Sequence, residues 1–87
     1  MYFVYLLECG DQSIYTGITT DVERRFQEHQ AGVGSAYTRS RKAVKMLYIE
    51  KYRTRSAAAR RETAIKRLSR REKLVLISCN GGDSGRV

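Results

Sequence analysis

Two short runs of aromatic and branched apolar residues near the N-terminus constrain the fold more than any other feature of this sequence. Residues 2–8 and residues 14–18 both have a strand-like composition, and residues 9–13 between them include a glycine, an aspartate and a serine. Runs of this kind separated by a few turn-forming residues are typical of a β-hairpin. We therefore expect the fold to be built on antiparallel strands.

The first predicted helix follows this hairpin. Residues 20–23 have the Thr-x-x-Glu form of a capping box, in which side chains at the two ends of the first turn bond to the backbone. Val22 and Phe26 lie four residues apart, as apolar residues on one face of a helix do. These features predict a helix that runs to about Gln30, where two nearby glycines end it.

A third strand and a second helix are predicted next. Residues 36–43 are polar and basic without a period, which indicates a loop, whereas residues 45–52 alternate apolar and charged side chains and are strand-like. Ser56 is placed to cap a helix that runs through Leu68. Its apolar stripe at helical spacing is formed by Ala57, Ala58, Ala64, Ile65 and Leu68. Arg61 falls within that stripe, and the sequence gives no reason for a charge there.

The last predicted element is a short helix. Residues 69–72 repeat the capping-box form ahead of four apolar residues, 74–77, although such a run is also compatible with a strand. The order ββαβαα predicts an α+β domain, a small three-stranded antiparallel sheet with helices packed on it. We expect this domain to span residues 1–79 and the glycine-rich residues 80–87 to form a flexible tail.

The basic composition predicts a polyanionic partner. The 87 residues include 17 Lys and Arg against 9 Asp and Glu, a formal net charge of +8, and such an excess on one small domain attracts nucleic acid. Many small basic proteins bind nucleic acid only weakly, so charge alone does not establish a function.

The cysteines and the N-terminus favour a cytoplasmic protein. Cys9 and Cys79 lie far apart without the spacing of a zinc site, so both are expected to be reduced. The apolar stretch at residues 2–7 lacks a basic leader and is too short for a signal peptide or a membrane span. We expect a monomer in the cytoplasm, with no membrane partner.

Short motifs on the predicted hairpin carry a family resemblance. Residues 3–5 (Phe-Val-Tyr) and 15–17 (Tyr-Thr-Gly) resemble the paired motifs that name the GIY-YIG nucleases, and Arg25, His29 and Glu62 follow in the order and approximate spacing of that family. The first motif has Phe in place of Gly, and the second has Thr in place of Ile. The resemblance covers residues 2–77 and is closest to small stand-alone bacterial members.

This resemblance implies a metal-dependent endonuclease that hydrolyses phosphodiester bonds in nucleic acid, with a role in DNA repair or processing. DNA is favoured over RNA as the substrate, and the choice stays open. Water would be the nucleophile and Tyr5 the general base, with Tyr15 as the other candidate. Both tyrosines can face one site if the strand register allows it. The simpler interpretation is that Tyr5 fills a half-buried sheet position. Gly17 suits the close approach of a backbone or a ligand to the strand, and the simpler interpretation is an irregularity in the strand.

Three further residues complete the catalytic set that the resemblance implies. Arg25 and His29 lie one helical turn apart and share a face; Arg25 would stabilise charge on the scissile phosphate, and His29 would relay a proton or orient water. A lone histidine is more often structural. Glu62 would bind one divalent ion, Mg²⁺ or Mn²⁺, which commonly takes one carboxylate with water and phosphate oxygens. Its alternative role is a surface ion pair with Lys66.

A basic loop in the middle of the chain is the candidate nucleic-acid-binding surface. Phosphate contacts are expected from Arg39, Arg41, Lys42 and Lys66, with Tyr37 placed to stack on a base. Two alternatives to a nuclease stay open: a nucleic-acid-binding module of the same fold with little or no turnover, and a basic protein partner of a ribonucleoprotein.

Overall fold

The elements follow the predicted order ββαβαα in the computed structural model, which describes residues 1–33 and 42–78. The strands are β1 (Tyr2–Cys9), β2 (Ile14–Thr19) and β3 (Ala43–Tyr52), and the helices are α1 (Val22–Gln30), α3 (Arg55–Lys66) and α4 (Arg70–Leu76). The predicted α+β fold with a three-stranded antiparallel sheet is confirmed.

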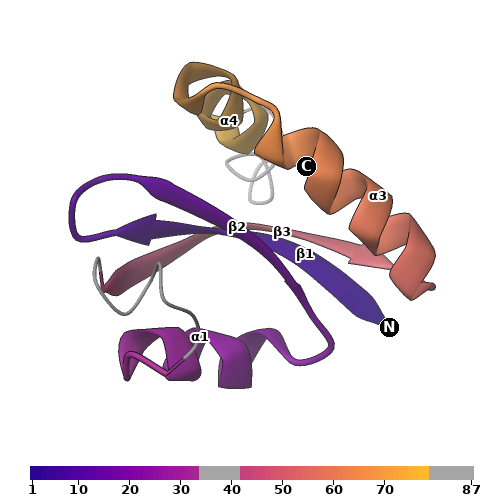
Figure 1. The fold of residues 1–87 in the computed structure, drawn as a ribbon, viewed down its shortest axis with the longest axis horizontal. Helices are drawn as coiled ribbons and strands as arrows, with labels where there is room; N and C mark the ends of the chain where they lie inside the picture. The colour runs from indigo at the N-terminus through magenta and orange to yellow at the C-terminus, as the bar shows by residue number, and fades with distance from the viewer. Residues whose placement is uncertain (34–41, 79–87) are drawn as a thin grey trace.

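The sheet has the strand order β2-β1-β3, so β1 is its central strand. Figure 1 shows α1 on one side of the sheet and α3 and α4 on the other. Val4 and Leu6 point to the face covered by α3, where they pack with Ile65, whereas Tyr5 and Leu7 point to the face covered by α1. All four of these β1 side chains are at most 1% exposed, so the central strand has a core on each side.

Side-chain caps define where the helices begin. Asp21 caps α1, one residue after the predicted Thr20, and Thr54 caps α3, two residues before the predicted Ser56. Ser, Thr and Asp are nearly equivalent as caps. The sequence therefore does not specify which of two nearby candidates caps each helix, and the place where the preceding strand ends determines it. The second predicted capping box, between Ser69 and Glu72, is confirmed with both of its hydrogen bonds, and α4 is a helix.

Arg61 lies within the apolar stripe of α3 because it has a partner on the sheet. Its guanidinium donates two hydrogen bonds to the carboxylate of Glu50 on β3, with N···O distances of 2.9 and 3.0 Å. The hydroxyls of Tyr48 and Tyr52 donate to the same carboxylate at 2.5 and 2.6 Å. Glu50 therefore joins β3 to α3 through a polar network beside the core, and Arg61 holds the pKa of its carboxyl below the ordinary value against the effect of burial.

The described residues bear on the expectations about membrane spans and cysteines. No helix within residues 1–33 and 42–78 is long and apolar enough to cross a membrane. Cys9 is a buried thiol, and Cys79 lies outside the described residues.

The contact between Arg61 and Glu50 leads to a stability prediction. Arg61→Ala leaves the Glu50 carboxylate without its cation, and we expect it to lower the free energy of unfolding by about 1.5–3 kcal/mol, the range for hydrogen bonds to charged groups. The Arg61 side chain is 36% exposed, which places the loss toward the lower end. Urea denaturation measures it, with the exposed neighbour Arg60→Ala as the control. Equal losses in the two variants would contradict the proposed link.

Candidate active site

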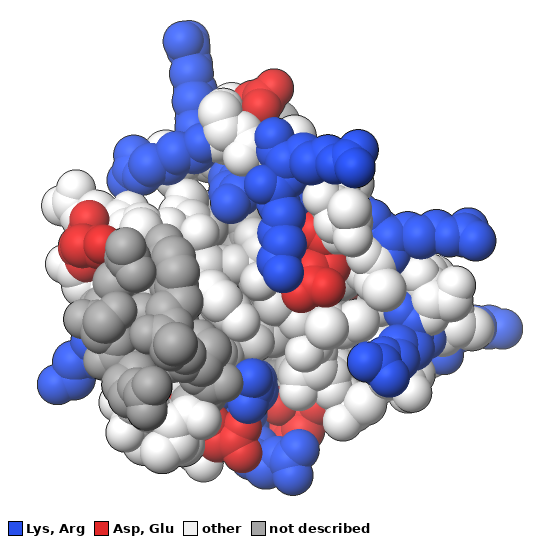
Figure 2. Space-filling model, in the orientation of Figure 1, with Lys and Arg blue, Asp and Glu red and all other residues white. Residues whose placement is uncertain are grey.

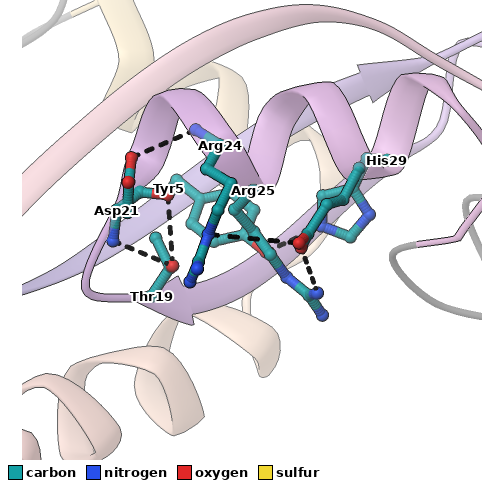
Figure 3. Close-up of polar contacts among 7 residues, drawn as sticks. Tyr5, Thr19, Asp21, Arg24, Arg25 and His29 are labelled. Carbon is teal, nitrogen blue, oxygen red and sulfur yellow. Dashed lines mark hydrogen bonds and ion pairs between the residues drawn. The ribbon is translucent and has the colours of Figure 1, made fainter.

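Tyr5 and His29 form a buried hydrogen bond between the sheet and α1. The Tyr5 hydroxyl lies 2.8 Å from Nε2 of His29, and the two residues are 1% and 0% exposed. Figure 3 shows Tyr5 from β1 beside the helix that carries Arg25 and His29. A buried hydroxyl and a buried imidazole each need a hydrogen-bond partner, and this contact supplies one to both.

Tyr15 lies on the same face as Tyr5. Tyr5 pairs with Gly17 and Leu7 pairs with Tyr15. Paired residues and residues two apart on a strand point to the same face, so the two tyrosines share one face of neighbouring strands. The ring centroid of Tyr15 is 6.3 Å from that of Tyr5 and 5.1 Å from that of His29. The three rings form one cluster between the sheet and α1.

Gly17 leaves the space that the Tyr5 ring occupies. A Cβ atom built at position 17 would overlap the hydroxyl oxygen and the adjacent ring carbon of Tyr5. No alternative side chain fits without moving the phenol. The close approach to the strand that was predicted for Gly17 is thus made by Tyr5 of the same protein.

Arg25 is held at the edge of this cluster by Glu28. The Arg25 guanidinium bonds to the Glu28 carboxylate at 2.9 Å, and the Arg25 side chain is 32% exposed. Sequence reasoning missed Glu28, although its place three residues after Arg25 is the spacing of a helical ion pair. Arg25 is thus oriented by its own helix and still open to solvent.

Tyr5 and His29 are both uncharged at neutral pH. Burial raises the pKa of Tyr5 to about 12, and the hydrogen bonding and charge of Arg25 oppose this without reversing it. Burial, followed by the charge of Arg25, lowers the pKa of His29 from 6.5. Desolvation is therefore a larger effect on the Tyr5 phenol than the nearby cation, and the hydroxyl stays protonated in the protein alone.

Glu62 projects from α3, which lies on the other side of the sheet and packs against β2 as well as β1. Its side chain is 19% exposed and forms an ion pair of 3.4 Å with Lys66, so the predicted helical pair is present. Burial is the main cause of the raised pKa of Tyr5, and the charge of the Glu62 carboxylate is the smallest of its causes. Among residues 1–33 and 42–78 no group of three or more His, Cys, Asp and Glu side chains is arranged to bind a metal ion.

The predicted nucleic-acid-binding loop is only partly described. Tyr37, Arg39 and Arg41 lie outside the described residues. Lys42 is exposed, has a positive φ of 61°, and accepts a hydrogen bond from the Gly10 backbone at the hairpin turn. Its role in binding stays a prediction.

The same arrangement of motifs is found in known proteins. The family model described as the GIY-YIG catalytic domain matches residues 1–74. The chain belongs to the GIY-YIG family. It is 53% identical over 72 residues to the UPF0213 protein HQ_3675A of Haloquadratum walsbyi, covering 83% of this chain and 81% of the relative. It is 47% identical over 81 residues to the UPF0213 protein NP_0776A of Natronomonas pharaonis, covering 93% and 95%.

A solved structure agrees with the fold. The solution NMR structure of the UPF0213 protein BH0048 from Bacillus halodurans matches with a TM-score of 0.61 and 44% identity, covering 94% of this chain and 88% of that one. In this GIY-YIG domain, Thr16 occupies the Ile position of the second motif. Thr16 is 3% exposed, and its hydroxyl has no hydrogen-bond partner among the described residues.

Gly17→Ala tests the packing of the GIY-YIG motif. The new Cβ must displace the Tyr5 ring, and we expect a loss of about 1–3 kcal/mol in unfolding free energy, as for overpacked cores. The loss should be much smaller in a Tyr5→Leu background, because leucine lacks the overlapping ring atoms. Urea denaturation of the two single variants and the double variant measures this coupling. Additive losses would show that Gly17 does not make room for Tyr5.

Proposed function

We propose that this protein is a metal-dependent endonuclease that hydrolyses phosphodiester bonds in nucleic acid, with Tyr5, Tyr15, Arg25, His29 and Glu62 as its active site. The observation that carries the proposal is the buried hydrogen bond of 2.8 Å between the Tyr5 hydroxyl and His29. It provides a route for a proton between two neutral groups, and such a route is what activation of a water molecule requires.

The proton route assigns distinct roles to the two residues. The attacking water gives a proton to the Tyr5 oxygen while Tyr5 passes its own proton to Nε2 of His29. Because the pKa of His29 lies below 6.5, the imidazole is neutral and able to accept at neutral pH. Tyr5 then never has to exist as a free phenolate, a state that its pKa of about 12 makes rare.

Arg25 supports the reaction through charge. As water adds to phosphorus, negative charge on the non-bridging oxygens increases, and a planar guanidinium with several donors stabilises it. Glu28 fixes the Arg25 side chain through the 2.9 Å contact, so less side-chain freedom is lost when the phosphate binds.

Glu62 is the residue that would hold the divalent ion. The donor set fits Mg²⁺ or Mn²⁺ in a limited way: one hard carboxylate, mostly buried, with the remaining positions left to water and to phosphate oxygens of the substrate. When bound, the ion supplies neutralisation of charge on the leaving oxygen. Lys66, which pairs with Glu62 at 3.4 Å, would then be free of that carboxylate and able to contact phosphate.

The substrate class follows from charge and family. The formal charge of +8 favours a polyanion, and we take DNA as the first substrate to test, in a repair or processing role.

Two observations favour the second candidate, a nucleic-acid-binding module without useful turnover. In the protein alone the pKa of Tyr5 is about 12, and the carboxylate proposed to bind metal is occupied by Lys66. Both features describe a site that is inactive until its ligands arrive.

The pH dependence of cleavage tests the proton route. Protonation of His29 removes the acceptor, so we expect log kcat/KM to rise with pH up to the pKa of His29, below 6.5, and then to stay level to about pH 9. A His29→Gln variant should be slow and should lose the acidic limb. If Tyr5 had to ionise first, the rate would keep rising toward its pKa of about 12, and the shared proton route would be wrong.

Glu62→Gln separates the nuclease from the binding module. The substitution keeps size and helix propensity but removes the charge, so the metal site should lose most of its affinity and cleavage should fall by about two orders of magnitude or more. Metal-free binding of the same oligonucleotide, measured at the same salt, should be unchanged or slightly tighter.

The matched control for Glu62→Gln is Glu23→Gln, an exposed position on α1, which should leave cleavage unchanged. Undiminished cleavage in Glu62→Gln would rule out the proposed metal site. No cleavage by the wild type of single-stranded, duplex or branched DNA or RNA with Mg²⁺ or Mn²⁺ would favour the binding module.

A further inference from the structure

A pocket beside the proposed active site is lined by arginines from two helices. It has a volume of about 290 Å³ and lies where β2 passes into α1 and where α3 begins. Arg24 and Arg25 of α1 and Arg55 of α3 line it, with Glu28 among them and with Thr20 and Tyr2 on its walls. These residues are distant in sequence, so only the folded chain brings the three guanidiniums together.

The charge in this pocket is not balanced. Three arginines and one glutamate line it, which leaves a net charge of +2 from these four residues. Glu28 lies 2.9 Å from Arg25 and 4.0 Å from Arg24, so both α1 guanidiniums share one carboxylate. Arg55 has no ion-pair partner within residues 1–33 and 42–78. An anion that enters the pocket therefore meets cationic charge that the protein does not neutralise.

The pocket adjoins the Tyr5–His29 contact through Arg25. Arg25 lines the pocket and also acts on the hydroxyl of Tyr5, whose pKa it lowers. In Figure 3, Arg24 and Thr19 lie on the side of Arg25 away from His29. A ligand in the pocket and a phosphate at Tyr5 would then lie on the two sides of one guanidinium.

We propose that this pocket binds a backbone phosphate of the cleaved strand, the one next to the scissile phosphate, through Arg24 and Arg55. The proposal rests on the proposed nuclease function for the identity of the strand. Guanidinium groups match the geometry of phosphate oxygens, and the Thr20 hydroxyl adds a donor of the kind that often contacts nucleic-acid backbones.

The shape and surroundings of the pocket favour a polymer backbone over a base. Arginine and threonine contacts to phosphate position a strand without reading its sequence. Because the pocket is open, the strand can continue on both sides of the bound phosphate. Figure 2 shows basic side chains, and no acidic ones, projecting from the right-hand end of the described residues in that view, the end at which α3 begins in Figure 1. The strand is expected to leave the active site toward this end.

Arg24→Ala combined with Arg55→Ala is the variant that tests the pocket. Losing one phosphate contact should flatten the slope of log affinity against log salt by about 0.7–0.9. The charge-matched control is Arg60→Ala with Arg71→Ala, two exposed residues outside the pocket, for which the slope should change less. Thermal unfolding of both variants checks that neither change acts through the fold.

A substrate with one uncharged methylphosphonate linkage locates the contact. The linkage is moved along an oligonucleotide, and binding is measured in the Tyr5→Phe background so that no cleavage interferes. In the protein that keeps Arg24 and Arg55, affinity should fall when the uncharged linkage is next to the scissile position. In the protein that also carries Arg24→Ala and Arg55→Ala, the uncharged linkage at that place should not lower the affinity further. Equal sensitivity in both proteins would overturn the proposed contact.

The outcomes separate this proposal from the nuclease itself. Cleavage by the wild type with no effect of the pocket variant on binding would leave the nuclease standing and remove the pocket from it. No cleavage with the salt and methylphosphonate effects intact would reject the nuclease and keep the pocket as a backbone-phosphate site. If the variant loses affinity for a mononucleotide 5′-phosphate but keeps affinity for the polymer, the pocket binds a free phosphate monoester and the proposal is wrong.

Discussion

The burial of the central strand on both faces is the constraint on which the rest of this structure depends. Residues Val4 to Leu7 of β1 are at most 1% exposed, so any polar atom they carry must find its partner inside the protein. Three of these four residues have apolar side chains. Tyr5 is the exception, and its hydroxyl reaches His29 on α1. A buried hydroxyl without that partner would cost about 1–3 kcal/mol, so this one contact ties the orientation of α1 to the sheet.

On the opposite face of the sheet, a charged contact positions the helix. Glu50 on β3 accepts from Arg61 and from the hydroxyls of Tyr48 and Tyr52, and this network fixes how α3 is rotated against the strands. Glu62 is the next residue along α3, so its direction depends on the same contact. Each half of the proposed active site is thus positioned by a polar contact that apolar packing alone would not specify, because apolar side chains tolerate small rotations and directional hydrogen bonds do not.

The sequence predicted the parts of the fold that depend on local patterns. Alternating and turn-forming residues identified the hairpin, and the box between Ser69 and Glu72 resolved a run of four apolar residues as a helix. Strand parity allowed Tyr5 and Tyr15 to share a face, and the register confirms that they do. Local patterns could not supply the partner of Arg61, because it lies 11 residues away on another element.

The protonation states of Tyr5 and His29 and the arginine pocket could also not be predicted from the sequence. The pKa of Tyr5 depends mainly on burial, which is a property of the packed helix and sheet. Arg55 joins Arg24 only because the start of α3 folds back to the start of α1. Glu28 differs from these, since its helical spacing from Arg25 was visible in the chain.

The electrostatics of the proposed site link substrate binding to catalysis. A phosphate that enters beside Tyr5 brings negative charge, and negative charge raises the pKa of a phenol further. Glu62 already acts in that direction. If Glu62 held a divalent cation, the charge at this position would change from −1 to +1, and its effect on Tyr5 would change sign. A phosphate alone would therefore make proton removal from Tyr5 harder, and a divalent cation bound at Glu62 would oppose that effect. Under the proposed function, the site would bind nucleic acid without cutting it until the ion is present, so binding without turnover and nuclease activity would be two states of one electrostatic arrangement.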